Sequence, residues 1–261
     1  MSLRFVDLSV PIAPPVEGEL TGELAPILAA SIDYQDHRAT LPAALRVFGC
    51  KEEDLPEGLA WASEQVSLST HTGTHMDGTY HYWPTSGGKK AKTVDEIPLE
   101  DCWGDGVVLD LRHKKAGERV MAAEVADALG KTGHQLKAGD IVCLRFGHDR
   151  HFGTPTYWDD YAGMSAEATI WLLDRGIKMI GTDAVGFDRG FPYQKADFER
   201  TGDRSLLWEA HRVGVDREYW QIEKMANLDQ LPPTGFKIAC FPVKIARASA
   251  GWVRPVAILG L

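Results

Sequence analysis

The segments IVCLRF (residues 141–146), AEATIWLLDR (residues 166–175) and KMIG (residues 178–181) decide the fold class of this chain. The first and third are short apolar runs with the length of a buried strand, and the run between them has the length of a helix. Ser165 is a suitable N-cap for this helix, and Gly176 is a suitable stop. The order strand, helix, strand predicts an α/β protein.

The alternation of strands and helices continues on both sides of this unit. Upstream, residues 107–111 are predicted as a strand and residues 122–129 as a helix that ends at Gly130. Downstream, the predicted elements are a short helix over residues 206–211 and strands over residues 219–225, 237–245 and 253–259. The last two strands are expected to form a hairpin with residues 247–251 as its loop. Such an ending favours a mixed sheet over a purely parallel one.

Side-chain alternation gives the predicted strand around Glu223 two different faces. Gln221, Glu223 and Met225 are expected on one face, and Trp220 and Ile222 on the other. If the two apolar side chains pack in the core, the carboxylate needs water, a cation or a donor to offset its desolvation. A solvated strand face and a metal pocket both meet this need, and the spacing alone favours the solvated face.

A second stretch, HTGTHMDGTYH at residues 71–81, has a composition that indicates metal binding. It contains three of the nine histidines of the chain, His71, His75 and His81, together with Asp77. Imidazole nitrogen and carboxylate oxygen are ligands of zinc and of its divalent neighbours. His71, His75 and Asp77 form a candidate set of three ligands, which leaves a coordination position for water. The alternative is that these are ordinary histidines hydrogen-bonded to their neighbours.

The spacing of these candidate ligands requires a bend in the chain. In a straight strand, the alpha carbons of residues 71 and 77 would lie about 20 Å apart, which is too far for one ion to bridge. Residues 65–69 alternate polar and apolar side chains like a half-buried strand, and Gly73 and Gly78 have the freedom to curve the chain after it. We therefore expect a strand followed by a bent ligand segment.

Residues 71–81 resemble the signature His-x-Gly-Thr-His-x-Asp-x-Pro-x-His of the putative cyclase family, which includes bacterial kynurenine formamidases and isatin hydrolases. Every defining position matches except the proline, which is Thr79 here. The similarity extends over residues 65–259. It includes His211 and Glu223, which stand ahead of an Asn-Leu segment as in the family.

The resemblance implies a single-domain α/β protein with a swivelling β/α fold, in which outer helices surround a mixed, barrel-like sheet. One domain is expected to span residues 1–261. Within it, residues 11–64 are expected to form a less regular N-terminal arm that lies over the site or contacts a second subunit. Family habit implies a homo-oligomer, either a dimer or a tetramer.

The resemblance also implies a metal-dependent hydrolase that cleaves the C–N amide bond of an aromatic or cyclic small molecule. A divalent ion, Zn²⁺ or Mn²⁺, lowers the pKa of bound water towards ~7 and polarises a carbonyl. His81 and Glu223 are the candidate catalytic residues, with His81 as the base for the water and the acid for the leaving nitrogen. His81, His211 and Glu223 could instead bind a second ion. The sequence leaves both the number of ions and their identity open.

Two other functions use the same residues. The site could open a lactone, since polarising a carbonyl does not require nitrogen as the leaving group, or it could hold a metal in a scaffold protein without turnover. Tyr80, Tyr82 and Trp83 could form an aromatic wall or pack in the core. Asp183 and Asp188, which follow a predicted strand, are expected to be exposed.

Composition agrees with a globular enzyme and excludes some partners. The 261 residues are 44% hydrophobic and 25% charged, and they carry a net charge of -9, which argues against binding to nucleic acid or an anionic membrane. No apolar run is long enough to cross a bilayer, and the first residues lack the apolar stretch of a signal peptide. The four cysteines are scattered singly, so a disulfide framework is not indicated and a cytoplasmic location is expected.

Overall fold

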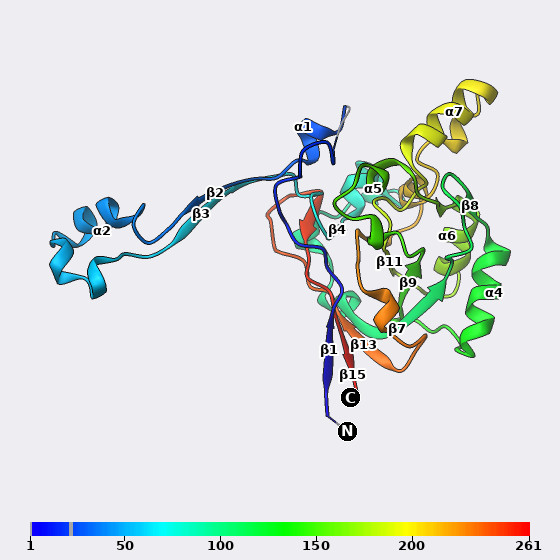
Figure 1. Ribbon diagram of the computed structural model, residues 1–261. Coiled ribbons are helices and arrows are strands. Elements are labelled where there is room, and N and C mark those ends of the chain that lie inside the picture. Colours follow the sequence, from blue (N-terminus) through cyan, green and yellow to red (C-terminus); the bar gives the residue numbers. More distant parts are fainter. Residues whose placement is uncertain (1, 21–22) are drawn as a thin grey trace.

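The computed structural model describes residues 2–20 and 23–261, and its main element is a curled, mixed sheet of nine strands (Figure 1). The order across the sheet is β1-β15-β13-β7-β9-β11-β12-β4-β14. In chain order these strands are β1 (Arg4–Asp7), β4 (His75–Asp77), β7 (Trp103–Asp110), β9 (Ile141–Arg145), β11 (Met179–Thr182), β12 (Trp220–Glu223), β13 (Phe236–Ala239), β14 (Ala250–Trp252) and β15 (Val256–Leu259). The mixed, curled α/β sheet confirms the predicted fold class.

The centre of the sheet is parallel and its two sides are antiparallel. β7, β9, β11 and β12 run parallel to one another, whereas β4 pairs antiparallel with both β12 and β14. Helices connect the parallel strands, among them α4 (Ala122–Thr132) and α6 (Ala166–Leu173). The Ser165 hydroxyl accepts a hydrogen bond from the amide of Ala168, which confirms the predicted N-cap of α6.

The central parallel strands are rich in apolar residues because both of their faces are largely buried. Along β9, Val142 and Leu144 belong to the cluster that packs under α4 and α6, whereas Ile141 and Cys143 belong to a second cluster on the other face of the sheet. Trp220 of β12 also belongs to this second cluster. The core therefore has two layers separated by the sheet.

Several predicted boundaries are wrong. The helix predicted to end at Gly130 continues to Thr132, because Gly133 is the residue that takes the left-handed conformation that ends it. The short helix expected over residues 206–211 is replaced by two 3₁₀ turns, Arg204–Leu206 and His211–Val215.

The predicted closing hairpin is also wrong in detail. β13 and β15 do pair antiparallel, but β13 stops at Ala239, shortly before Pro242, which has no amide proton to donate to a ladder. The expected loop over residues 247–251 contains the start of β14, which pairs with β4 at the opposite edge of the sheet. The chain between β13 and β15 therefore crosses from one side of the sheet to the other and returns.

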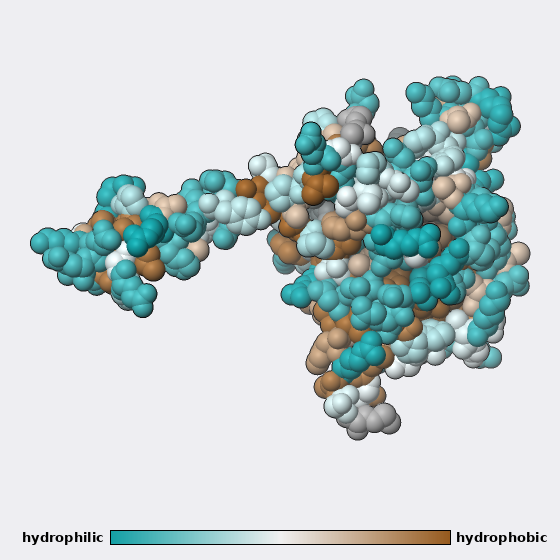
Figure 2. Space-filling model, in the orientation of Figure 1, coloured by the Kyte–Doolittle hydropathy of each residue, from teal (hydrophilic) through white to brown (hydrophobic). Residues whose placement is uncertain are grey.

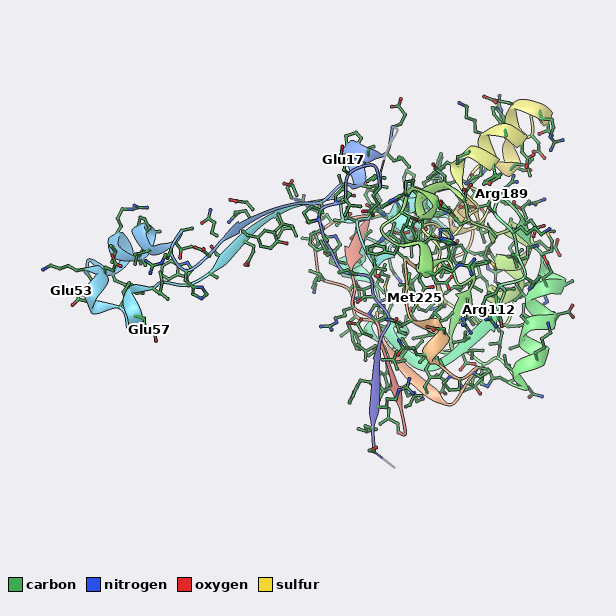
Figure 3. The ribbon with its side chains drawn as sticks, viewed as in Figure 1. Glu17, Glu53, Glu57, Arg112, Arg189 and Met225 are labelled. Carbon is green, nitrogen blue, oxygen red and sulfur yellow. The ribbon has the colours of Figure 1, made fainter. Side chains whose placement is uncertain are left out.

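A long two-stranded ribbon projects from the body of the molecule (Figure 1). It consists of β2 (Ser31–Gln35) paired antiparallel with β3 (Ser63–Ser67), and the connection between the strands carries the helix α2 (Leu41–Phe48) at the far end. Figure 2 shows hydrophobic side chains at this end, where Val47 is 72% and Phe48 62% exposed. Glu53 and Glu57 extend from the same tip (Figure 3). We call residues 31–67 the ribbon arm.

The remaining elements are short or lie at the surface. They are α1 (Ala25–Leu28), α3 (Thr79–Tyr82), α5 (Pro155–Asp159), α7 (Phe191–Thr201), and the strand pairs β5 (Thr85–Ser86) with β6 (Lys89–Lys90) and β8 (Arg119–Val120) with β10 (Gly163–Met164). None of the helices in the described ranges combines the length and the apolar character that a membrane crossing requires.

Candidate metal centre

The chain bends between residues 71 and 77, as the spacing of the ligands predicts. Gly73 adopts a left-handed conformation with φ of +66°, which glycine tolerates without strain. The side chain of Thr74 then ties the bend to two other segments, because its hydroxyl donates to the carbonyl of Lys224 over 2.5 Å and accepts from the amide of Val10 over 2.9 Å. β4 begins directly after this anchor, at His75.

Sheet register brings His75 opposite Glu223. β4 and β12 are antiparallel neighbours, with His75 paired to Glu223 and Asp77 paired to Gln221. Opposed side chains on one face of such a pair lie within contact distance. His75 Nε2 is 3.4 Å from Glu223 Oε2 and 3.5 Å from Asp77 Oδ1. Two carboxylates and an imidazole from two strands thus meet in the interior.

His71 and His81 complete one side of this cluster. His71 Nδ1 lies 3.1 Å from Asp77 Oδ1, and the rings of His71 and His81 have centroids 4.2 Å apart. His81 belongs to the short helix α3, which follows Gly78 directly. A Cβ at Gly78 would lie 2.8 Å from the carbonyl oxygen of Lys92, so this glycine permits a close approach of two backbones instead of a left-handed turn.

His211 approaches the cluster from the other side, at the start of a 3₁₀ turn. Its Nε2 is 3.6 Å from Glu223 Oε1 and 3.9 Å from Asp77 Oδ2. Its Nδ1 is hydrogen-bonded to Asp188, which also accepts the amide of Ala210 over 2.6 Å. The prediction that Asp188 is exposed is wrong, because only 5% of its surface is accessible. Asp183 is likewise buried, where its carboxylate accepts the amides of two residues after β9.

The hydrogen bond on the outer ring nitrogen of His75 leaves an acceptor nitrogen facing the cluster. His75 donates from Nδ1 to the carbonyl of Gly73 over 2.9 Å, so its Nε2 carries a lone pair that faces two carboxylates. That nitrogen and both carboxylate oxygens of Asp77 are buried without a hydrogen-bond partner among the described residues. A cation satisfies such a cluster of acceptors, whereas a hydrogen-bond network does not. The donor set therefore fits a divalent ion.

The pKa values of the cluster favour the charged form of both acids. Burial raises the pKa of Glu223, but the neighbouring His75, Lys224 and His211 bring it down to about 2. Burial also raises the pKa of Asp77, and the neighbouring histidines hold it below its ordinary value. Burial lowers the pKa of His81 to about 4, against the attraction of Asp77. At neutral pH the cluster presents two carboxylates and a neutral His81.

Two donor groups overlap within this cluster. His71, Asp77 and His81 offer ligand atoms that lie within 4.8 Å of one another, and so do His75, Asp77 and Glu223. The structure therefore brings together all six residues that the sequence singles out: His71, His75, Asp77, His81, His211 and Glu223.

The cluster lies at the wall of a cavity of about 860 Å³. Aromatic side chains line this cavity, namely Trp158, Tyr161, Phe191, Phe198 and Trp208. The aromatic residues next to the motif lie outside the lining of this cavity. Tyr80 and Trp83 are 48% and 56% exposed, whereas Tyr82 stacks on Tyr219 in the core. Trp208 stacks on His211, with ring centroids 4.9 Å apart. No spacing in the sequence links the cavity aromatics to the motif.

Lys224 is a further residue at the cavity that the sequence did not indicate. It follows Glu223 and adopts a left-handed conformation with φ of +59°. This turn reverses the alternation of β12, so Met225 packs in the core cluster with Ile222. The prediction that Met225 shares a face with Glu223 is therefore wrong.

Comparison with known proteins finds a matching family and named relatives. The family model described as putative cyclase matches residues 6–189. The chain is 27% identical over 196 residues to a kynurenine formamidase of Erythrobacter litoralis, covering 74% of each protein. It is 23% identical over 212 residues to an isatin hydrolase of Roseibium aggregatum, covering 78% of this chain and 77% of that protein.

Solved structures show the same fold. Isatin hydrolase A from Ralstonia solanacearum is similar with a TM-score of 0.75 and 23% identity, over 99% of this chain and 92% of that one. A potential metal-dependent hydrolase with cyclase activity is similar with a TM-score of 0.64 and 18% identity, over the full length of both chains. Since the family model covers well over half of the sequence, including the bend that carries the clustered histidines, this chain belongs to the putative cyclase family.

Proposed function

We propose that this protein is a metal-dependent hydrolase that cleaves the C–N bond of an amide in an aromatic or cyclic substrate. The observation that carries the proposal is the buried set of acceptor atoms on His75 and Asp77, which face Glu223 and have no hydrogen-bond partner in the described chain. Relatives named kynurenine formamidase and isatin hydrolase support the amide as the bond that is cleaved.

His71, His75 and Asp77 would hold the ion, which is Zn²⁺ or Mn²⁺, since nitrogen and oxygen ligands accept both. When bound, such an ion polarises the scissile carbonyl and makes water a better nucleophile near neutral pH. The two donor groups that share Asp77 are compatible with one or two ions. In the second case His81, His211 and Glu223 would also be ligands.

His81 moves the protons of the reaction. Its low pKa leaves the imidazole neutral at pH 7, so it can accept a proton as the oxygen of water forms a bond to the carbonyl carbon. It then donates that proton to the nitrogen as the C–N bond breaks. Glu223 adds a second carboxylate beside the reacting groups, and the hydrogen bond that Asp188 accepts from His211 Nδ1 fixes which nitrogen of His211 faces the site.

The cavity supports a flat or cyclic substrate. Its aromatic walls offer faces on which a ring can stack, and such contacts add to the free energy of burial. The volume of about 860 Å³ exceeds the need of a small ring, which leaves space for a substituent.

Metal analysis combined with chelation tests the proposal. Purified protein is expected to contain one or two equivalents of a divalent ion by plasma mass spectrometry. Chelation should abolish hydrolysis of an N-formyl arylamine or a cyclic amide, and added Zn²⁺ or Mn²⁺ should restore it. The variant His75→Ala should lose the ion, whereas His113→Ala, whose side chain is 55% exposed, serves as the matched control.

Three outcomes would change the assignment. A protein that takes up no divalent ion is not a metal-dependent hydrolase. Faster turnover of lactones than of matched cyclic amides would assign the same site to ester opening. A protein that binds metal but hydrolyses neither class would be a metal-holding scaffold.

We also propose that the whole chain acts as one hydrolase domain in a homo-oligomer, a dimer or a tetramer, in the cytoplasm. Residues 11–64 would form an arm that contacts a second copy. Support comes from the ribbon arm, because an isolated two-stranded ribbon is marginally stable and its tip exposes Val47 and Phe48. The four cysteines are unpaired, which suits a reducing compartment.

A further inference from the structure

Lys224 links the two segments that carry the candidate ligands. Its carbonyl accepts the hydroxyl of Thr74, and its Nζ donates to the carbonyl of His71 over 3.2 Å. The ammonium also lies 3.9 Å from Glu223 Oε2. The residue lines the large cavity together with His71, His81 and Glu223.

This position is unfavourable for a lysine in two respects. The left-handed backbone suits glycine or asparagine and strains a bulky residue. The side chain is only 4% exposed, so the ammonium has lost most of its water. Among the described residues the carbonyl of His71 is its acceptor within hydrogen-bond distance, which leaves two N–H donors for another group. Such a combination at a cavity wall indicates a function.

The charge of Lys224 does not serve the metal. An ammonium repels a divalent cation, and the carboxylate that it approaches, Glu223, already faces His75 and His211. The ammonium of Lys224 would therefore be complementary to a negative charge that develops on the substrate beside the reacting centre. Amide hydrolysis creates such a group, because addition of water moves the π electron pair of the carbonyl onto its oxygen.

We propose that Lys224 is a further catalytic residue, whose ammonium binds the oxyanion that forms at the scissile carbonyl and then the carboxylate of the product. This inference rests on the proposed amide hydrolysis. When the C–N bond breaks, the electron pair on the oxygen re-forms the C=O bond, and the nitrogen leaves with one proton of the water. The acid loses the other proton to solvent and is released as a carboxylate. The ammonium donates hydrogen bonds throughout and neither gains nor loses a proton.

The variant Lys224→Met removes the charge and roughly keeps the length. Because the interaction strengthens as charge develops, kcat should fall by about 10²-fold while KM changes little. The metal content should stay the same or rise, since a repulsive charge is gone. Lys224→Asn, which suits the left-handed backbone, should show the same loss of kcat in a fold at least as stable as the wild type. Lys131→Met on the surface of α4 is the matched control.

A binding measurement separates this inference from the proposed function. Benzoate, an aromatic carboxylate, and neutral benzamide are titrated calorimetrically into metal-loaded wild type, Lys224→Met and Lys131→Met. We expect Lys224→Met to bind benzoate at least tenfold more weakly and benzamide with unchanged affinity. If the wild type hydrolyses no amide, the proposed function fails, and the benzoate result alone then decides whether Lys224 binds a carboxylate.

Several results would overturn the inference. Absence of benzoate binding by the wild type, or equal benzoate affinity in wild type and Lys224→Met, would show that the ammonium does not bind an anion. An unchanged kcat in both Lys224 variants would remove it from the reaction. A fall in kcat that is accompanied by loss of metal in both variants would make Lys224 a structural tie between the ligand segments.

Discussion

His81 lies in a buried setting that lowers the pKa of its imidazole. Its ring lies 5.5 Å from that of His211 and 5.3 Å from that of Trp208, between centroids, and burial holds its pKa at about 4. Formation of a negative charge on the substrate would raise that pKa and drive proton transfer to the imidazole. A residue whose basicity depends on the reacting group suits acid–base catalysis.

We therefore expect His81→Ala to lower kcat by at least about 10²-fold while most of the bound metal remains. Turnover of an N-formyl arylamine and metal content by plasma mass spectrometry are measured on the same preparation, with His113→Ala as the control. If the ion is lost together with turnover, His81 is a ligand of a two-metal site. Unchanged turnover would remove His81 from the mechanism.

Site residues that lie close together in the sequence could be recognised from it. Residues that meet only in the folded structure could not. His71, His75, Asp77 and His81 lie within one bend, so their spacing carries the information. Asp188 contacts His211 only through tertiary structure, and an aspartate after a strand has no pattern that separates it from an exposed one. Single residues such as Lys224 escape pattern analysis for the same reason.

Strands and helices of the parallel half were predictable because their apolar runs report burial on both faces. The antiparallel half was less so, since its pairings join segments far apart in the chain. β14 lies between β13 and β15 in sequence but pairs with β4 across the sheet. Local apolar pattern contains no information on such pairing, which explains the wrong closing hairpin.

At the level of elements, Asp183 fixes the turn that follows β9. Its carboxylate accepts the amides of Phe146 over 2.8 Å and Gly147 over 2.7 Å. Burial is the main cause that raises the pKa of Asp183 to about 7, compared with 3.8 as its ordinary value. The folded protein therefore holds a proton at Asp183 that the unfolded chain releases near pH 4.

This difference makes stability dependent on pH. Relative to Asp183→Asn, the wild type should have its full stability below pH 4 and lose it progressively as the pH rises to about 7. The two pKa values differ by about 3, which corresponds to roughly 4 kcal/mol at most. Urea unfolding of metal-free wild type and variant at pH 4.5 and 7.5 measures the effect. A stability difference that is the same at both pH values would contradict it.

On the scale of the whole molecule, the ribbon arm is separate from both core clusters. Neither cluster contains a residue from the range 31–67, so the arm adds little to the stability of the body. Phe48 and Trp61 contact each other at the tip, with ring centroids 6.1 Å apart, and both remain exposed. An exposed apolar tip on an extended ribbon is typical of a contact between subunits.

Replacing residues 36–62 by an Asn-Gly turn keeps β2 and β3 paired and removes the tip. We expect the molar mass measured by light scattering to fall from that of an oligomer to that of a monomer. The unfolding midpoint of the body, measured in urea, should change little, which serves as the internal control. A shortened protein that retains the mass of the wild type would show that subunits associate through another surface.

The register between β4 and β12 has a consequence for maturation of the protein. His75 and Glu223 come from distant parts of the chain and face each other only once these two strands have paired. The local trio His71, His75 and Asp77 is present early, but Glu223 joins it only after the two strands have paired. The proposed site would therefore be complete only in the folded chain, unlike the site of small zinc modules, whose folding requires the metal. If the proposed metal dependence holds, cells starved of the ion would accumulate a folded but inactive protein that later metal supply could activate without renewed synthesis.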